Sequence, residues 1–258
     1  MHIRIHLSAL AFSAAALALL VPASPALASG SSWSWGGERV QGNGNIKTQK
    51  RDTPHFTGVA SALSGNVDVR IGASESIQIE TDENLLPLIE TVVENGVLKI
   101  RPTKKNLNLE TRSMKIVVNA KEVERLSLGG AGNLDADAVR GTRVKVDLGG
   151  SGAIHLRAAE AEDLAVVIGG SGNVKIDGGT ASKLSVTIGG SGDLNAGNLK
   201  ARDVSINIGG SGQATVWASD SLNLTVAGSG DVNYYGDPRV SKSVLGSGGA
   251  KRLGPAPR

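Results

Sequence analysis

The sequence contains no cysteine, and aromatic residues make up only 3% of its 258 residues. Without cysteine it has no disulfide framework, no thiol nucleophile and no site for a lipoprotein anchor. With so few aromatic residues, a core must be built from valine, isoleucine, leucine and alanine. Small aliphatic side chains suit a narrow, regular interior better than a broad globular one.

Histidine and net charge are also scarce. The formal net charge is +3, which gives no basic stripe for nucleic acid, so we expect no nucleic-acid partner. Beyond the first 28 residues only His55 and His155 remain. A metal site needs converging His, Cys, Asp or Glu side chains. We therefore predict neither a metal ion nor another cofactor.

One apolar run stands near the beginning of the chain. It extends from Leu7 to Val21, follows a mildly basic start with Arg4, and is succeeded by Ala26-Leu27-Ala28. This order is typical of a signal peptide, so we predict that residues 1–28 are removed before Ser29. The run is short for a bilayer span and no later run is longer. We expect an exported protein without a transmembrane segment after cleavage, in the periplasm or at the cell surface.

A short glycine phrase recurs through the second half of the chain. Its spacing is 20 residues, with a worn copy before it and two shortened copies after it that follow at 18 residues. A fixed period of this size is typical of repeat architectures. The Gly-Gly-Ser-Gly phrases begin at Gly149, Gly169, Gly189 and Gly209, the worn copy at Gly129, and the shortened copies at Gly228 and Gly246.

Apolar residues recur at fixed positions within each repeat, counted from its first glycine. Positions 6 and 8 are apolar, as in Ile154 and Leu156, and so are positions 16, 18 and 20, as in Leu164, Val166 and Ile168. Such alternation indicates two short strands per repeat, each with one buried face. An antiparallel meander would need a second apolar layer, which the chain does not supply. We predict an all-β, parallel β-helix-like solenoid with coils of about 20 residues.

The glycine phrase is best explained as the corner of each coil. Glycine reaches positive φ without steric cost, and stacked corners without side chains can approach closely. The phrase does not fit the calcium-binding nonapeptide, whose sixth residue is aspartate, because Ile154, Val174 and Leu194 stand there. No Lys-Ser/Thr pair follows it, as a phosphate-binding loop requires.

We expect a flexible lead-in over residues 29–39 (with Trp33 and Trp35), a less regular β region over 40–125, the repeat solenoid over 126–248 and a tail over 249–258. In the irregular region, 42–47 and 64–71 look like divergent copies of the glycine phrase and its strand. Asn95-Gly96 between two apolar runs predicts a hairpin.

The repeat is preceded by Phe56-x-Gly58-Val59, by Gly65-Asn66-Val67-Asp68-Val69 and by Asp82-Glu83-Asn84-Leu85. With these motifs, the chain from about Val40 to Gly248 resembles the putative auto-transporter adhesin, head GIN domain family. The resemblance implies a right-handed parallel β-helix-like fold in exported bacterial proteins. It lends no catalytic residue to this sequence.

Two outward columns of the predicted solenoid form a candidate ligand-binding strip, called the outer strip below. One interpretation is a carbohydrate groove, in which aromatic faces and charged groups contact sugars. The other is a solvated face whose charges pair between coils, at about 0–1 kcal/mol per pair. Position nine holds Asp137, Arg157, Asp177, Gly197, Trp217 and Tyr235, and position seven holds Asp135, His155, Lys175, Asn195, Thr215 and Asn233.

We therefore expect a non-enzymatic, exported β-solenoid of the bacterial envelope that presents a surface for binding or adhesion. A glycan or another envelope protein would be its partner, and pairing of coil ends into an oligomer is left open. The alternative is a polysaccharide-binding or polysaccharide-cleaving protein on the same scaffold. In the cleaving case Asp135, Asp137 and His155 would supply the acid and the base.

Overall fold

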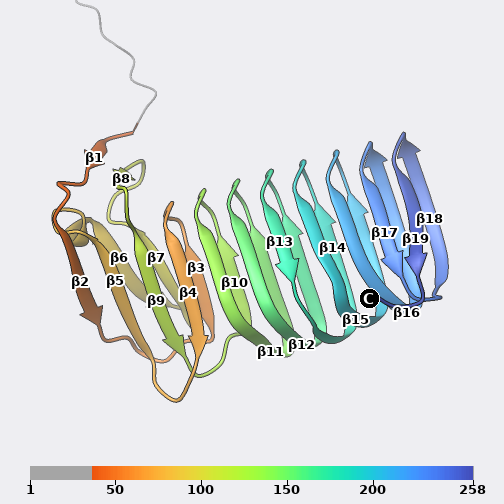
Figure 1. Ribbon diagram of the computed structural model, residues 1–258, viewed down its shortest axis with the longest axis horizontal. Coiled ribbons are helices and arrows are strands. Elements are labelled where there is room, and N and C mark those ends of the chain that lie inside the picture. The colour runs from red at the N-terminus through yellow and green to blue at the C-terminus, as the bar shows by residue number, and fades with distance from the viewer. Residues whose placement is uncertain (1–36, 258) are drawn as a thin grey trace, which may run out of the picture. The chain divides into compact units, whose positions relative to one another are not determined.

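The computed structural model describes residues 37–257, and within them the chain is almost entirely β, as predicted (Figure 1). The one helical element in this range is a 3₁₀ turn, η1 (Leu86–Leu88). No helix among these residues is long and apolar enough to cross a membrane. The predicted signal peptide, Trp33 and Trp35 lie outside the described residues.

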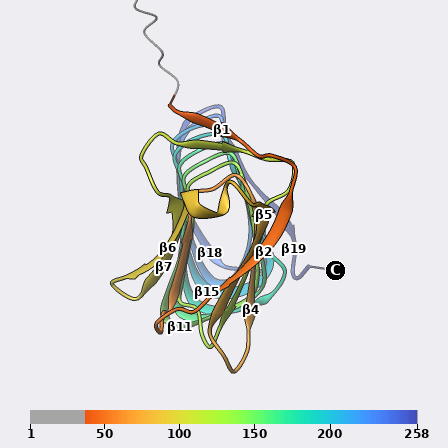
Figure 2. The same ribbon diagram turned by 90° about the vertical axis from the view of Figure 1, so that its left-hand side faces the viewer.

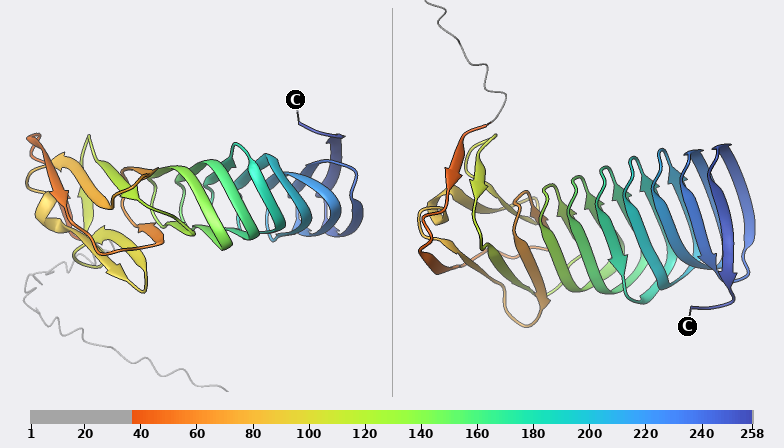
Figure 3. Two further views of the ribbon diagram at one scale, coloured as in Figure 1. Left: turned by 90° about the horizontal axis from the view of Figure 1, so that it is seen from below. Right: turned by 45° about the horizontal axis from the view of Figure 1, so that its top comes forward.

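Parallel strands build the regular part of a solenoid. Leu134 pairs with Ile154, and Ile154 pairs with Val174, so that each coil lies one repeat of 20 residues from the next. This parallel register confirms the solenoid and excludes the antiparallel meander. Figures 1 and 3 show the coils as successive rungs. The strands are β10 (Arg125–Leu128), β11 (Asn133–Leu148), β12 (Ala153–Ile168), β13 (Asn173–Ile176), β14 (Gly179–Ile188), β15 (Asp193–Ile208) and β16 (Gln213–Gly228).

The predicted apolar columns fill the narrow interior, which Figure 2 views along the stack. Val166 and Ile168 have no exposed surface, and Ala136 is 3% exposed. A further buried position, which simple alternation does not indicate, lies at the second corner of the coil and holds Val139, Ala159 and Leu199 in different repeats. Aliphatic side chains alone therefore close the interior of the regular coils.

The corner glycines leave room for the preceding coil. A Cβ on Gly170 would lie 2.2 Å from the carbonyl oxygen of Gly150, and one on Gly172 would lie 2.2 Å from that of Gly152. Positive φ was the other role expected of them, and this was wrong for the four complete phrases, none of whose glycines has positive φ. The backbone turns there in an ordinary conformation, and close stacking excludes the side chain.

The first glycine of the phrase is under no such restriction. A Cβ on Gly149 would meet nothing within 4 Å, and one on Gly169 would meet its nearest atom at 3.9 Å. The shortened copies agree with this, because Ala227 and Leu245 occupy that first position. The stacking constraint thus falls on the second and fourth residues of the phrase.

The first half of the chain belongs to the same stack, but its order in space differs from its order in sequence. β3 (Gly58–Ser61) lies between β7 (Val97–Pro102) and β10, and β4 (Asn66–Ile71) lies between β9 (Lys115–Ala120) and β11. The chain begins the stack with β3 and β4, runs outward to finish one end, and returns to continue on the other side. The predicted copy at 64–71 is therefore a true coil.

Antiparallel strands close this N-terminal end of the solenoid. β5 (Ser76–Asp82) pairs with β9 and β2 (Ile46–Arg51), and β6 (Ile89–Glu94) pairs with β7. The interpretation of residues 42–47 as a copy of the glycine phrase and its strand was wrong, because β2, which begins there, is antiparallel to β5 and exposed. The hairpin at Asn95-Gly96 is confirmed, with φ of 53° and 75°. β1 (Arg39–Gln41) pairs with β8 (Asn108–Glu110) in a small separate sheet.

The Asp82-Glu83-Asn84-Leu85 motif holds the loop that precedes β2. The Asp82 carboxylate is 3% exposed and accepts hydrogen bonds from the Gly44 amide at 2.6 Å and the Thr111 hydroxyl at 2.5 Å. The Asn84 side chain accepts from the Asn43 amide at 3.0 Å and donates to a neighbouring carbonyl oxygen. The motif is therefore part of the N-terminal cap.

The opposite end is left as an open coil. β18 (Arg239–Gly246) pairs in parallel with β16, and β19 (Gly249–Gly254) pairs in parallel with β17 (Asp231–Tyr235). Val240, Leu245 and Leu253 are exposed by 40%, 71% and 42%. The two ends of the described body are thus finished in different ways.

Candidate functional site

The charged part of the outer strip is a ladder of side chains from consecutive coils. His155 on β12 lies between two carboxylates, with Nδ1 3.2 Å from Oδ1 of Asp135 on β11 and Nε2 2.6 Å from Oδ2 of Asp177 after β13. Lys175 approaches the other oxygen of Asp177, with Nζ 2.8 Å from Oδ1. Parallel stacking places Asp135, His155 and Asp177 on successive rungs, so the imidazole of His155 lies between two carboxylates.

A second pair lies beside this ladder. The Arg157 guanidinium donates from Nη1 to Oδ1 of Asp137 at 2.8 Å, and Oδ2 of Asp137 accepts from the Ile71 amide at 3.2 Å. These groups line a shallow hollow of about 330 Å³ together with Asp68 and Arg70 of the preceding coil. Both oxygens of Asp137 are therefore engaged within the protein.

The protonation of Asp177 favours charge pairing over proton donation. Hydrogen bonds from Lys175, and then from His155, hold the pKa of Asp177 below its ordinary value. A carboxyl group that donates a proton near neutral pH needs a raised pKa. Asp177 is shifted in the opposite direction.

The aromatic part of the strip does not continue the column of Asp137 and Arg157 as expected. Ala196 pairs with Val216, but the next pair joins Lys200 to Trp217, so the predicted alignment of Trp217 with Gly197 is wrong. The coil that begins at Gly209 is two residues shorter than those before it, and the shortening falls at its second corner. Trp217 consequently lies opposite Lys200, whose Nζ is 5.7 Å from the ring centroid.

Trp217 and Tyr235 form an aromatic pair on neighbouring coils. Their Cα atoms are partners in the β16–β17 register, and both side chains are half-buried. Tyr235 extends back to Gly197, since its Cε2 atom lies 3.3 Å from the place where a Cβ of Gly197 would stand. The glycine therefore leaves space for the ring. Asn195 and Thr215 belong to the adjoining polar column.

The structure thus separates the predicted site residues into two groups. His155 contacts both Asp135 and Asp177, and Arg157 contacts Asp137, whereas the aromatic pair lies on later coils. Lys200 was missed by sequence reasoning. The change of period from 20 to 18 residues signalled a register break near it, although not at which corner of the coil. Within residues 37–257, no three His, Cys, Asp or Glu side chains are grouped to hold a metal ion.

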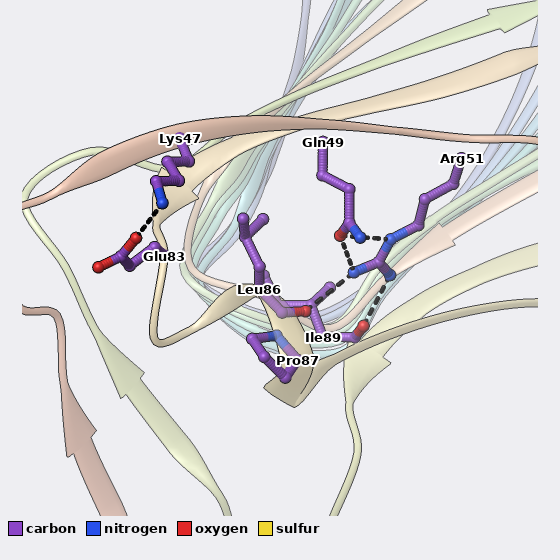
Figure 4. Close-up of a pocket in the computed structure, with 7 residues that line it drawn as sticks. All are labelled: Lys47, Gln49, Arg51, Glu83, Leu86, Pro87 and Ile89. Carbon is purple, nitrogen blue, oxygen red and sulfur yellow. Dashed lines mark hydrogen bonds and ion pairs between the residues drawn. The ribbon is translucent and has the colours of Figure 1, made fainter.

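A larger hollow, of about 580 Å³, lies on the N-terminal cap (Figure 4). The Arg51 guanidinium donates there to the Ile89 carbonyl oxygen at 2.7 Å, the Leu86 carbonyl oxygen at 2.9 Å and Gln49 Oε1 at 2.8 Å. Lys47 forms an ion pair with Glu83. These cations stabilise the cap, so little of their charge faces a ligand.

Several solved structures share this fold. A protein from Parabacteroides distasonis ATCC 8503, described as a putative lipid binding protein, is 28% identical, with a TM-score of 0.70 over 84% of this chain and 100% of its own. Putative adhesins from Bacteroides fragilis NCTC 9343 and Parabacteroides merdae ATCC 43184 are 24% and 23% identical, with TM-scores of 0.76 and 0.67. They cover 83% and 84% of this chain, and each is covered completely.

Comparison by sequence gives the family. No curated protein matches the chain. The family described as "Putative auto-transporter adhesin, head GIN domain" matches residues 55–238, which include the coil of β3 and β4, the cap strands from β5 onward and most of the repeat. The chain therefore belongs to the head GIN domain family of putative auto-transporter adhesins.

Proposed function

We propose that this chain is an exported, non-enzymatic binding protein of the bacterial envelope that presents the outer strip of its solenoid in an adhesin-like role. The observation that carries the proposal is the division of the strip. Its charges are paired with one another, whereas Trp217 and Tyr235 are register partners whose side chains are half-buried. The solenoid supplies a rigid support, and the aromatic pair supplies the surface.

The charged ladder supports binding over catalysis. Cleavage of a polysaccharide needs two carboxyl groups with different protonation, one as proton donor. In the strip, His155 lies between Asp135 and Asp177, and Asp137 accepts from Arg157 and a backbone amide. A group engaged in this way must first lose its partner before it can act on a substrate.

Glycans are the ligand class that suits the aromatic pair. Sugar rings have apolar faces that lie against tryptophan and tyrosine, and their hydroxyl groups hydrogen-bond to amides and charged groups. Trp217 and Tyr235 offer the first, while Asn195, Asn233 and Lys200 offer the second. A lipid is less well suited, because the interior columns of the described coils are filled by buried side chains. That argument holds even though one similar structure is described as a putative lipid binding protein.

Glycan-array binding tests the proposal. Trp217→Ala and Tyr235→Ala should each reduce binding at least tenfold, whereas Asn223→Ala, an outward substitution beyond the second corner of the same coil, should leave it unchanged. Reducing-end release from the bound glycan should be absent. Release that is abolished by Asp137→Ala would establish the polysaccharide-cleaving alternative. If Asn223→Ala loses binding as Trp217→Ala and Tyr235→Ala do, the aromatic site is refuted.

The location of the protein requires a separate measurement. Cell fractionation combined with protease treatment of intact cells should find the chain exported, and degradation without lysis would place it at the cell surface. Protection until the outer membrane is opened would place it in the periplasm, where an envelope partner replaces an external one. Recovery in the cytoplasm would overturn the proposal.

A further inference from the structure

The coil of β18 and β19 stands at the C-terminal end of the described residues, and one edge of each strand is unpaired there. β18 pairs with β16, and β19 pairs with β17, each through one edge only. Among residues 37–257, the register gives β18 and β19 no other partner than these. Unpaired backbone amides and carbonyls of this kind accept an added strand, and natural proteins protect such edges when no strand is wanted.

The interior columns change character at this edge. Leu224 pairs with Lys242, and Tyr234 pairs with Arg252. In these two interior columns, a cationic residue therefore stands where the preceding regular coils have hydrophobic residues. Val240 and Val244 stand on either side of Lys242 in the neighbouring interior columns. The edge therefore presents the pattern apolar, cation, apolar along β18.

Charge at this end disfavours a second copy of the chain. Residues 239–254 include Arg239, Lys242, Lys251 and Arg252 and no acidic residue. Two such ends placed together would bring like charges face to face, which is destabilising across paired strands. The β2 strand at the other end contains no acidic residue. Head-to-tail stacking on β2 would therefore offer Lys242 no carboxylate from that strand. Neither arrangement satisfies Lys242.

We propose that the β18 edge binds an extended acidic segment of a partner protein by strand addition, with a carboxylate over Lys242 and aliphatic side chains over Val240 and Val244. Main-chain hydrogen bonds would supply affinity, and the alternate side chains would supply specificity. The proposed surface is separate from the outer strip, so either can fail without the other.

Labelled peptides test this proposal by fluorescence anisotropy. The probe is Thr-Val-Thr-Glu-Thr-Val-Thr with blocked ends, and its control carries lysine in place of glutamate. We expect the purified protein to bind the glutamate peptide at least tenfold more tightly than the lysine peptide. Lys242→Glu should reverse that order. Lys251→Glu makes the same change of charge in an outward position on β19 and should leave the order unaltered.

Other outcomes would overturn the proposal. Equal affinity for the two peptides, or no binding of either up to about 1 mM, would exclude a carboxylate-specific edge. An equal effect of Lys251→Glu and Lys242→Glu would reduce the interaction to general charge attraction. Sedimentation velocity provides the remaining arm: if the unmodified protein self-associates and Lys242→Glu prevents this, the occupant is a second copy.

Discussion

Gly170 in the repeat coils and two glycines of the N-terminal cap, Gly44 and Gly96, serve different physical purposes. In the repeat, Gly170 has an ordinary backbone conformation, but a Cβ there would lie 2.2 Å from the Gly150 carbonyl oxygen. In the cap, Gly44 and Gly96 have φ of 80° and 75°, while a Cβ would meet nothing within 4 Å at Gly44 and its nearest atom at 4.0 Å at Gly96. Gly170 uses the missing side chain for space, whereas Gly44 and Gly96 use it for conformation.

This difference teaches how the same residue type can be recognised in its two roles. A position that needs space rejects every side chain, whereas a position that needs positive φ accepts asparagine more readily than alanine. Substitution by both residues therefore separates the roles experimentally. It also shows which glycines of a repeated phrase are required, since Ala227 and Leu245 already replace the first one.

The largest effect is expected for Gly170→Ala. The added methyl group would collide with backbone of the adjacent coil, which cannot move without separating paired strands. Overpacking of this kind costs about 3 kcal/mol of unfolding free energy. Gly169→Ala, at the neighbouring unrestricted position, should change it by less than about 0.5 kcal/mol. Urea denaturation of both variants measures the difference.

The asparagine variant sharpens this result. Gly170→Asn should be at least as destabilising as Gly170→Ala, because both carry a Cβ. Recovery of stability by asparagine would mean that the corner needs conformation after all, and the distinction between the two regions would be lost.

A smaller effect is expected at the cap hairpin. Gly96→Ala forces an L-residue into left-handed conformation, which costs about 1–2 kcal/mol. Gly96→Asn should recover most of that loss, since asparagine tolerates this region and the preceding Asn95 already adopts it with φ of 53°. Thermal denaturation of the pair checks the order. Equal midpoints for the two variants would contradict a conformational role.

The regular coils could be predicted from sequence because two periods coincide there. Alternation gave the buried faces of residues such as Val166 and Ile168, and the 20-residue spacing gave their partners in the next coil. The spacing of the last phrases also showed that a coil is shorter. It could not show that the shortening falls beside Lys200, because phrase spacing measures the length of a coil and not the path of each corner.

The cap and the site were harder to predict from sequence for a physical reason. β3 lies between β7 and β10, which are distant from it in sequence, and local sequence patterns do not predict such long-range pairing. The Gly42–Asn45 loop resembled a corner because it contains similar turn residues, although Asp82 holds it in place. In the outer strip, the columns indicated which side chains are neighbours. The particular partners of His155 depend on side-chain geometry, which the columns do not specify.

The pH dependence of stability provides a further comparison, between Asp82 in the cap and Asp177 in the repeat. The pKa of Asp82 is lowered, first by the Thr111 hydroxyl, from its ordinary value of 3.8. Its contribution to stability is therefore present above the unfolded-state pKa and is lost as pH falls through the folded-state pKa. Asp82→Asn should be less stable at pH 7 and should lose less stability than the unmodified protein below about pH 4.

The unfolding free energy at pH 7, 5, 4 and 3 tests this. Asp177→Asn is the control, because the pKa of Asp177 is also lowered but its side chain is 37% exposed, where solvent screens the interaction. It should follow the pH dependence of the unmodified protein more closely than Asp82→Asn does. A larger effect at Asp177 would make the exposed ladder, and not the cap, the acid-sensitive element.

The smallest effect is expected for Arg157→Gln in the outer strip. This arginine is 69% exposed and its ion pair with Asp137 is open to solvent, so its loss should cost less than about 0.5 kcal/mol. Arg51→Gln provides the contrast, since that guanidinium donates to backbone carbonyls of the cap at 2.7 and 2.9 Å, and charged hydrogen bonds contribute about 1.5–3 kcal/mol. Chemical denaturation at low and high salt measures both.

The outcome at Arg157 bears directly on how the strip is understood. If the substitution is neutral for stability, the paired charges are surface groups that a ligand can rearrange, as a binding face requires. If Arg157→Gln costs as much as Arg51→Gln, the ladder supports the coils in the way that the cap does. The outer strip would then be a structural element, and the aromatic pair alone would be left to bind a partner.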